Sequence, residues 1–286
     1  MKSVKYFIQF LIISILFIFF KILGLRLASY VSSKIIYFFG PFFRSKNLIK
    51  SNISKALPNL NKKEIKEISK SMWSNYGRIL AEYVFIKEIR NSKMKSNIQV
   101  NGQEILEKIK EKNEPVIFIS GHFNNFELMA MHIEKSGVDL AAIYRPLNNI
   151  FLSPIMEKIR KKYICSKQIK KGISGTKEIL NYFKSGSSIA LMIDQRVSEG
   201  IKSLLFRNEA LTTTIPAQFV KKFNCKIVPI YIERESNENF MLEIMQPISF
   251  DNGETIENIT LKLNQLLEKM IIRNPYQWIW SHNRWK

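Results

Sequence analysis

Short apolar runs alternate with amphipathic stretches along the second half of the chain. Runs rich in Ile, Val, Leu and Phe predict buried strands at residues 115–120, 139–144, 188–194, 226–233 and 240–247. Apolar residues at helical spacing predict helices at residues 126–135, 153–163, 175–183, 214–223 and 256–272. This alternation is typical of an α/β fold, and we expect a mixed β-sheet flanked by helices.

Residues 47–96, ahead of the predicted sheet, have the periodicity of helices. The segment 57–61 contains Pro58 and interrupts them, and Asn61 is placed to cap a helix that starts at Lys62. Apolar and aromatic side chains then recur at helical spacing from Met72 to Tyr83. We interpret this stripe as a face that packs against the rest of the protein.

The N-terminal region is strongly apolar. The run 6–20 contains only Gln9 and Ser14 as polar interruptions, and a second apolar run covers residues 30–43. A bilayer span needs roughly 20 apolar residues, so the first run suffices only if Lys21 extends toward the headgroups. We predict that residues 1–45 are an uncleaved membrane-anchor helix with an interfacial segment, and that residues 46–286 form one domain.

Two other interpretations of this region stay open. A signal peptide has the same basic start and apolar centre, although no small-x-small cleavage site follows closely. A helix that lies in the membrane interface is the second. Basic residues on the C-terminal side of the run favour a cytoplasmic position for the domain. They are Lys21, Arg26, Lys34, Arg44, Lys46 and Lys50.

Net charge narrows the possible partners. The chain has 44 Lys and Arg against 24 Asp and Glu, a formal charge of +20, which indicates an anionic partner such as nucleic acid or anionic lipid. A bias toward Lys, Ile and Asn explains part of this excess. No segment interleaves aromatic and basic residues, so nucleic acid is not predicted. Cys165 and Cys225 lie far apart, outside any metal-ligand spacing, and favour a reducing compartment.

A histidine follows the first predicted strand. Residues 121–127 read Gly-His-Phe-Asn-Asn-Phe-Glu, and His122 is one of only three histidines. An unperturbed histidine pKa near 6.5 suits a general base. Residues five apart do not share a helix face, so His122 and Glu127 converge only if His122 lies in the turn before the helix. Asn124 or Asn125 is expected to cap that helix, whose free N–H groups would face a developing oxyanion.

Polar residues also follow the next two predicted strands. Tyr144 and Arg145 follow one, and Asp194, Gln195 and Arg196 follow the other. Each type is individually more common at surfaces and in turns. Because chemistry collects beyond the carboxyl ends of parallel strands, we expect these residues to line one cleft with His122. Two arginines and a helix N-terminus there would suit a phosphate group.

Several familiar sites are missing from the sequence. Residues 172–176 lack the final glycine of a nucleophile elbow, and no P-loop or GxGxxG motif occurs. His122 and His132 lack a metal-binding spacing, and His132 is interpreted as a packing or surface residue. We therefore expect neither a metal nor a cofactor.

Taken together, these segments resemble the bacterial lipid A biosynthesis late acyltransferases of the lauroyl/myristoyl type, within the glycerolipid acyltransferase superfamily. The first matching block is His-x4-Glu at His122. The others are Tyr144-Arg145-Pro146, Ile193-Asp194-Gln195-Arg196, Leu205-Phe206 with Ala210-Leu211-Thr212-Thr213, Ile227-Val228-Pro229-Ile230, and the Trp-rich tail from Gln277 to Trp285. One departure is Leu205-Phe206-Arg207, where relatives often have a Phe-Phe-Gly step.

The resemblance implies transfer of a fatty acyl chain from acyl carrier protein, or acyl-CoA, to a hydroxyl group of a lipid A precursor in lipopolysaccharide biosynthesis. His122 would be the general base and Glu127 would orient it. The implied substrate-binding residues are Asn124, Asn125, Tyr144, Arg145, Asp194, Gln195 and Arg196. Residues 46–286 would be the acyltransferase domain of a monomer, on the cytoplasmic side of the bacterial inner membrane. Acyl carrier protein, an anionic lipid acceptor and inner-membrane phospholipids would be its partners.

Two alternative functions stay open. In the first, the protein is an acyltransferase whose acceptor is another phosphoglycolipid or a lysophospholipid. In the second, it is a non-catalytic membrane lipid-binding protein. The intact His122–Glu127 block counts against the second. Trp278, Trp280 and Trp285 are expected to pack the tail onto the core rather than to lie at headgroup level.

Overall fold

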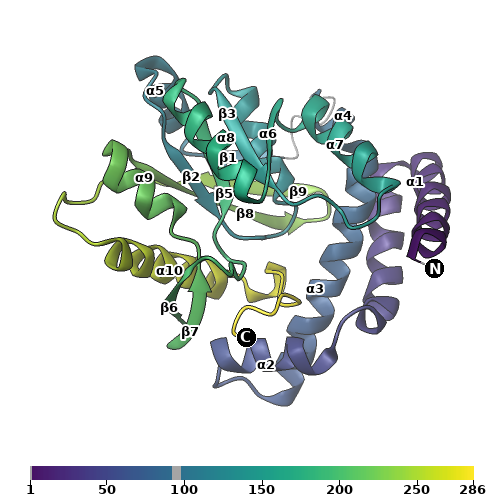
Figure 1. The fold of residues 1–286 in the computed structure, drawn as a ribbon. Coiled ribbons are helices and arrows are strands. Elements are labelled where there is room, and N and C mark those ends of the chain that lie inside the picture. The colour runs from purple at the N-terminus through teal and green to yellow at the C-terminus, as the bar shows by residue number, and fades with distance from the viewer. Residues whose placement is uncertain (1, 92–97) are drawn as a thin grey trace.

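A mixed sheet lies at the centre of the computed structural model, which describes residues 2–91 and 98–286 (Figure 1). The strand order is β1-β9-β8-β2-β5-β3-β4, and every neighbouring pair is parallel except β8 and β9. The strands are β1 (Ile98–Asn101), β2 (Ile117–Ser120), β3 (Leu140–Tyr144), β4 (Lys167–Lys170), β5 (Ser188–Met192), β8 (Ile227–Ser236) and β9 (Asn239–Ile244). A separate hairpin pairs β6 (Ile201–Leu205) with β7 (Asn208–Thr212). The predicted α/β fold with a mixed sheet is confirmed.

Burial explains why the central strands could be predicted from the sequence. β2 lies between β8 and β5, and all four of its residues are buried, so it reads as a continuous apolar run. All five predicted strands appear. β1 and β4 were not predicted, because both are short edge strands with little apolar signal. Polar and apolar residues alternate in β1, and Ile169 is the one apolar residue of β4. The β6–β7 hairpin was also missed, since its turn uses Phe206 and Arg207 at positive φ instead of the glycine or asparagine that marks such turns.

The predicted helices also appear, within a few residues of their expected ends. Helices that flank the sheet are α5 (Gln103–Lys112), α6 (Glu127–Lys135), α7 (Leu152–Tyr163), α8 (Ile173–Lys184), α9 (Ile215–Phe223) and α10 (Ile256–Arg273). The N-terminal helices are α1 (Lys2–Phe39), α2 (Lys46–Ala56), α3 (Lys62–Glu82) and the short α4 (Ile86–Arg90). Asn61 caps α3 as predicted: its side chain accepts a hydrogen bond from the Glu64 N–H, and the Glu64 side chain accepts one from the Asn61 N–H. The last part of the predicted helical stretch, residues 92–96, lies outside the described residues.

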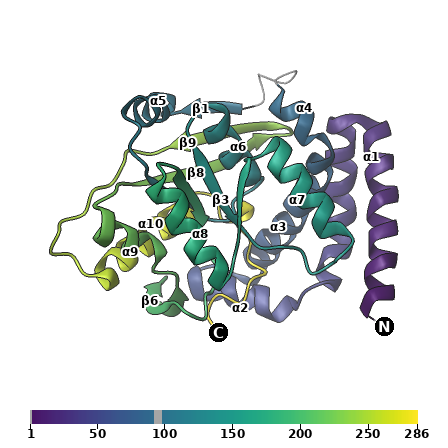
Figure 2. The ribbon, with the colours of Figure 1, turned by 45° about the horizontal axis from the view of Figure 1, so that its top comes forward.

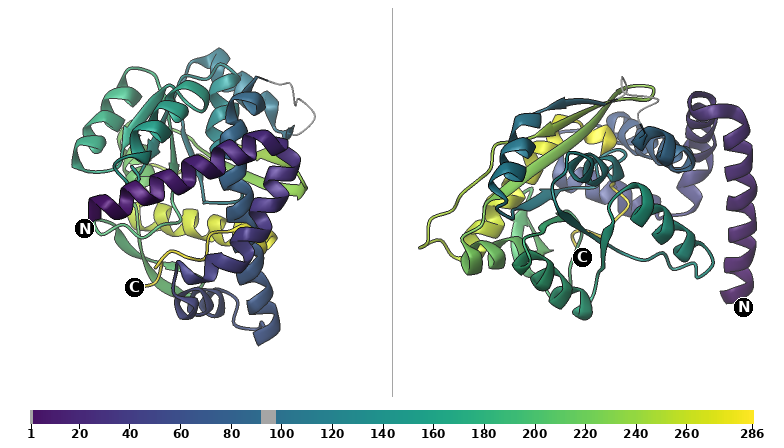
Figure 3. Two further views of the ribbon diagram at one scale, coloured as in Figure 1. Left: turned by 90° about the vertical axis from the view of Figure 1, so that its right-hand side faces the viewer. Right: turned by 90° about the horizontal axis from the view of Figure 1, so that it is seen from above.

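The first helix bends at one glycine. Gly24 has a φ of 74°, which a residue with a Cβ adopts only with strain, and it divides α1 into residues 2–23 and 25–39. The second half packs along α3, where Ala28, Ser29, Ser32 and Ser33 are buried. The first half diverges from α3 and runs along the outside of the molecule (Figure 3).

The C-terminal tail crosses the molecule near α3 (Figures 1 and 2). It begins with a 3-10 turn at Pro275–Gln277, and Trp278, Trp280 and Trp285 are all buried. Asn52 of α2 donates a hydrogen bond to the Trp280 carbonyl oxygen at 2.8 Å. The expectation that the tryptophans pack the tail onto the core is therefore confirmed.

Candidate active site

Strand register places His122 next to Asp194. Ser120 at the end of β2 pairs with Met192 at the end of β5, so His122 and Asp194 each lie two residues beyond a paired position. The His122 Nδ1 atom is 2.8 Å from Asp194 Oδ1. β3 is the neighbour of β5 on its other side, and Arg145 follows β3 at the same edge of the sheet. The expectation that the three strand ends converge is met for His122 and Asp194.

Asp194 is buried and accepts several hydrogen bonds. The backbone N–H of His122 donates to Oδ2 at 2.7 Å, and the Trp278 indole N–H donates to the same oxygen at 2.8 Å. Burial raises the pKa of Asp194, but the attraction of His122 and the hydrogen bonds outweigh it and hold the pKa well below its usual range. An ionised Asp194 accepts the Nδ1 proton of His122, which leaves Nε2 unprotonated and able to accept a hydrogen bond.

A second histidine completes the arrangement. The Gln195 amide nitrogen lies 3.1 Å from Nε2 of His122 and 2.9 Å from Nε2 of His282, so one NH2 group faces both imidazoles. Burial lowers the pKa of His282 to about 4. The nearby cationic groups lower it as well, and the negative charge of Asp194 only partly opposes them. His282 is therefore neutral near pH 7 and accepts from Gln195. We call His122, Asp194, Gln195 and His282 the histidine cluster.

Sequence reasoning missed His282. It lies in the tail, 160 residues from His122, and no local pattern links the two positions. The one available signal was that it is one of three histidines and lies within the Trp-rich tail. The third histidine, His132 of α6, forms a hydrogen bond with Gln103 of α5 at 2.8 Å. It lies outside the cluster, as expected.

The structure corrects the expected contact between Glu127 and His122. Glu127 accepts two hydrogen bonds from Arg160, at 2.8 and 2.6 Å, and lies 3.5 Å from the Tyr83 hydroxyl. The Phe126 ring packs edge-on against the imidazole, with ring centroids 4.7 Å apart. The turn therefore sends Glu127 to the Arg160 side, and Asp194 takes the place beside Nδ1 that was expected of Glu127.

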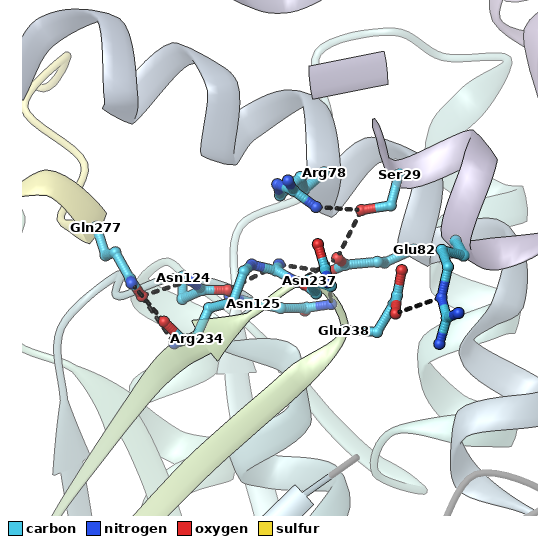
Figure 4. A network of polar contacts seen from close by, with 10 residues as sticks. Ser29, Arg78, Glu82, Asn124, Asn125, Arg234, Asn237, Glu238 and Gln277 are labelled. Carbon is cyan, nitrogen blue, oxygen red and sulfur yellow. Dashed lines mark hydrogen bonds and ion pairs between the residues drawn. The ribbon is translucent and has the colours of Figure 1, made fainter. Parts of the chain in front are cut away.

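Asn124 and Asn125 are also corrected. Both are buried, and their side chains bond to protein groups rather than face the cleft. Neither caps α6, whose N-cap residue is Phe126 without a side-chain cap. Their partners are Glu82 of α3, Arg234 of β8 and Gln277 of the tail (Figure 4).

These contacts form a second polar cluster on the same turn. Arg234 pairs with Glu82 at 2.7 Å and also donates to Asn124 Oδ1 at 3.0 Å. Gln277 accepts from the Arg234 N–H and donates to its carbonyl oxygen, both at 2.8 Å. We call Glu82, Asn124, Asn125, Arg234 and Gln277 the arginine cluster. It ties the turn to α3, β8 and the tail (Figure 4).

The other predicted site residues lie around the same edge of the sheet. Tyr144 is buried beside Arg160, and its burial, followed by the nearby charge of Glu157, raises its pKa to about 12. Its hydroxyl is therefore turned toward α7. Arg145 and Arg196 are exposed. Within the described ranges, no three His, Cys, Asp or Glu side chains gather as a metal site would require.

Comparison with known proteins identifies related chains. The family model for bacterial lipid A biosynthesis acyltransferase matches residues 1–286. The chain is 22% identical over 251 residues to the lipid A biosynthesis palmitoleoyltransferase of Escherichia coli (strain K12), covering 86% of this chain and 80% of that protein. It is 19% identical over 232 residues to the lipid A biosynthesis myristoyltransferase of the same organism, covering 80% of this chain and 71% of the other. It is also 22% identical over 196 residues to the lipid A biosynthesis acyltransferase 2 of Shigella flexneri, covering 66% and 60%.

Proposed function

The chain belongs to the bacterial lipid A biosynthesis acyltransferase family, and on that premise we propose that it transfers a fatty acyl chain from acyl carrier protein to a hydroxyl group of a lipid A precursor, with His122 as general base. One observation carries this mechanism. His122 Nδ1 is bound to the buried carboxylate of Asp194 at 2.8 Å, and the His122 side chain is 16% exposed. Nε2 is thus the atom that receives the proton.

The reaction then proceeds without an acyl-enzyme. The acceptor hydroxyl loses its proton to Nε2 of His122 while its oxygen bonds to the carbonyl carbon of the thioester. The tetrahedral intermediate collapses, the carbon–sulfur bond breaks, and the departing thiolate takes the proton from His122. Asp194 stabilises the imidazolium that forms between these two steps, as the carboxylate does in other histidine-based acyl transfer sites.

We propose Gln195 as the oxyanion donor. Its amide nitrogen lies 3.1 Å from Nε2 of His122, so a hydroxyl bound at Nε2 would displace this contact. His282 would still hold the amide at 2.9 Å, and the freed N–H would be available to donate to the thioester oxygen. A fixed donor of this kind stabilises the developing charge on the thioester oxygen.

Charge and hydropathy suit the proposed partners and location. Arg145 and Arg196 are exposed at the edge of the sheet that carries His122, where they would bind phosphate groups of the acceptor or donor. The net charge of +20 attracts both acidic acyl carrier protein and anionic lipid. One described helix, at the N-terminus, is long and apolar enough to enter a membrane. We place the enzyme on the cytoplasmic side of the inner membrane.

The test is acyl transfer by the detergent-solubilised protein. Acyl carrier protein thioesters and a Kdo-bearing lipid A precursor are mixed with wild type, His122→Ala or His132→Ala, and products are read by mass spectrometry. We expect a mass gain of one acyl chain with wild type and with His132→Ala, whose histidine lies outside the cluster. His122→Ala should lose about 10²–10⁴-fold in rate, the usual contribution of a general base.

Transfer that survives His122→Ala would remove His122 from the mechanism. Transfer to a lysophospholipid or another phosphoglycolipid, but not to the lipid A precursor, would contradict the proposed acceptor. It would leave the proposed acyl-transfer reaction in place. Activity with acyl-CoA alone would contradict the proposed donor.

A further inference from the structure

The first half of α1 is fastened to the protein near both of its ends. The Asn149 side chain, in the connection between β3 and α7, donates a hydrogen bond to the Tyr6 carbonyl oxygen at 2.8 Å. The Phe151 ring contacts Phe7, with ring centroids 5.5 Å apart. About 22 Å further along the helix, at 1.5 Å per residue, Lys21 pairs with Glu88 of α4. Figure 3 shows this half of α1 along the outside of the molecule, next to the chain that leads into α7.

These attachments oppose a crossing of the membrane by the first half of α1. In a helix that crosses the membrane, Tyr6 and Lys21 would lie near opposite faces of a hydrocarbon core about 30 Å thick. Asn149 and Glu88, which contact them, would then also have to lie at membrane depth near opposite faces, although both belong to the same folded domain. The first half of α1 instead lies on the same side as the rest of the protein.

Exposed apolar side chains continue from α1 onto the connection that holds it. Beyond residue 43, the exposed large apolar side chains of the described chain are Leu147, Ile150, Ile155, Leu204, Ile272 and Tyr276. Three of these six lie within nine residues, at 147–155, and Ile150 is 60% exposed. They adjoin α1, where Ile8, Leu11, Ile12 and Ile15 are exposed as well. Clustered exposed apolar residues of this kind mark an interaction surface.

Cations lie on the adjoining part of α7. Lys158 and Lys162 follow Ile155 at intervals of three and four residues, so the three side chains share one stripe of the helix. Lys158, Lys161 and Lys162 are exposed, and Arg145 is exposed where the connection begins. An apolar edge bordered by lysines matches a bilayer with anionic headgroups, because such a surface attracts basic side chains close to it.

We propose that residues 147–155 are a second membrane contact, which enters the interface of an anionic bilayer together with the first half of α1. This proposal rests on the membrane location given under Proposed function and extends it from the N-terminal helix to the connection after β3. Arg145 lies at the start of this connection and at the end of a strand of the catalytic edge. The membrane surface therefore meets the edge of the sheet that carries His122, so a lipid acceptor reaches the base without leaving the bilayer.

The test uses tryptophan as a depth probe in the full-length protein. Ile150→Trp and Leu204→Trp are each bound to vesicles of phosphatidylethanolamine and phosphatidylglycerol, with and without brominated acyl chains. Leu204 is the matched control, because it is 47% exposed on β6, away from α1 (Figure 1). The four native tryptophans are all buried and give a constant background. We expect brominated lipid to quench the emission added by Ile150→Trp and to leave that added by Leu204→Trp unchanged.

Two further measurements separate the possible failures. Ile150→Asp should weaken vesicle binding by about tenfold or more, because burial of an isoleucine side chain is lost. Ser3→Cys should react with a membrane-impermeant maleimide on the side of the vesicle to which protein was added. Wild type that fails to bind vesicles would overturn the membrane location itself. Binding with unquenched Trp at position 150, or protection of Cys at position 3, would overturn only the second contact.

Discussion

The turn after β2, which contains His122, Asn124 and Asn125, contributes to two polar clusters that differ in how far their side chains are exposed. In the arginine cluster, the Arg234 and Glu82 side chains are 7% and 1% exposed and neutralise each other at 2.7 Å. In the histidine cluster, the Asp194 side chain is equally buried, but the His122 side chain it holds is 16% exposed. The difference teaches that neighbouring polar residues in one motif serve unrelated purposes. Asn124 and Asn125 hold the turn in place, and His122 is the partly exposed residue that we propose as the base.

The largest expected loss of stability comes from breaking the arginine cluster. Glu82→Gln leaves the Arg234 guanidinium buried without its counter-charge, which should lower the free energy of unfolding by about 3–5 kcal/mol. Denaturation in mild detergent measures this loss. Glu209→Gln is the matched control, because its pair with Lys202 is largely exposed and contributes about 1 kcal/mol or less. Equal losses in the two variants would contradict a structural role for the arginine cluster.

A pair of glutamine variants sharpens the comparison. Gln195→Ala should reduce turnover by about 10²–10³-fold, the usual cost of a lost oxyanion donor, with little change in stability. Gln277→Ala should instead cost about 1–3 kcal/mol of stability, because the Arg234 N–H loses its acceptor. Turnover and denaturation are measured for both. The comparison fails if the two variants lose activity and stability in the same proportion.

The last expected effect, small at any one pH step, is the pH dependence of the stability that neutral His282 contributes. His282 has a pKa of about 4 in the folded protein, against about 6.5 in an unfolded chain. Between these values the unfolded state binds more protons, so this contribution to stability is present above pH 6.5 and is lost as the pH falls toward 4. His282→Asn removes it, and its stability should fall less steeply with pH, by up to about 1.4 kcal/mol per pH unit. Parallel curves for wild type and variant would show that His282 is not held neutral.

The sequence predicted the fold where burial was strong and failed where it was weak. Ile117 and Ile119 lie in a strand covered on both faces, so their apolar run identified β2 without tertiary information. β4 has the polar pattern of an edge strand and gave no such signal. His122 and Asp194 were both identified as site residues, because the ends of parallel strands meet at one edge.

The partner of His122 was not predictable in the same way. Which carboxylate reaches Nδ1 depends on the register between β2 and β5, and hydrophobic patterns do not determine which strands are neighbours. The family resemblance implied Glu127 as this partner, but the structure places Glu127 against Arg160 instead. His282 reaches the site only through tertiary contacts of the tail, such as those of Trp280 with Asn52 of α2 and Met72 of α3.

The account depends on Asp194, rather than Glu127, as the partner of the base. The most direct test is the turnover of Asp194→Asn and Glu127→Gln, each corrected for its folded fraction. An amide at position 194 can donate to Nδ1, which moves the His122 proton to Nε2 and removes the lone pair that accepts the substrate proton. We predict a loss of about 10⁴-fold for Asp194→Asn, the cost of the same change in a serine protease, and a loss of about tenfold or less for Glu127→Gln. A near-normal Asp194→Asn enzyme beside an inactive Glu127→Gln enzyme would contradict the account.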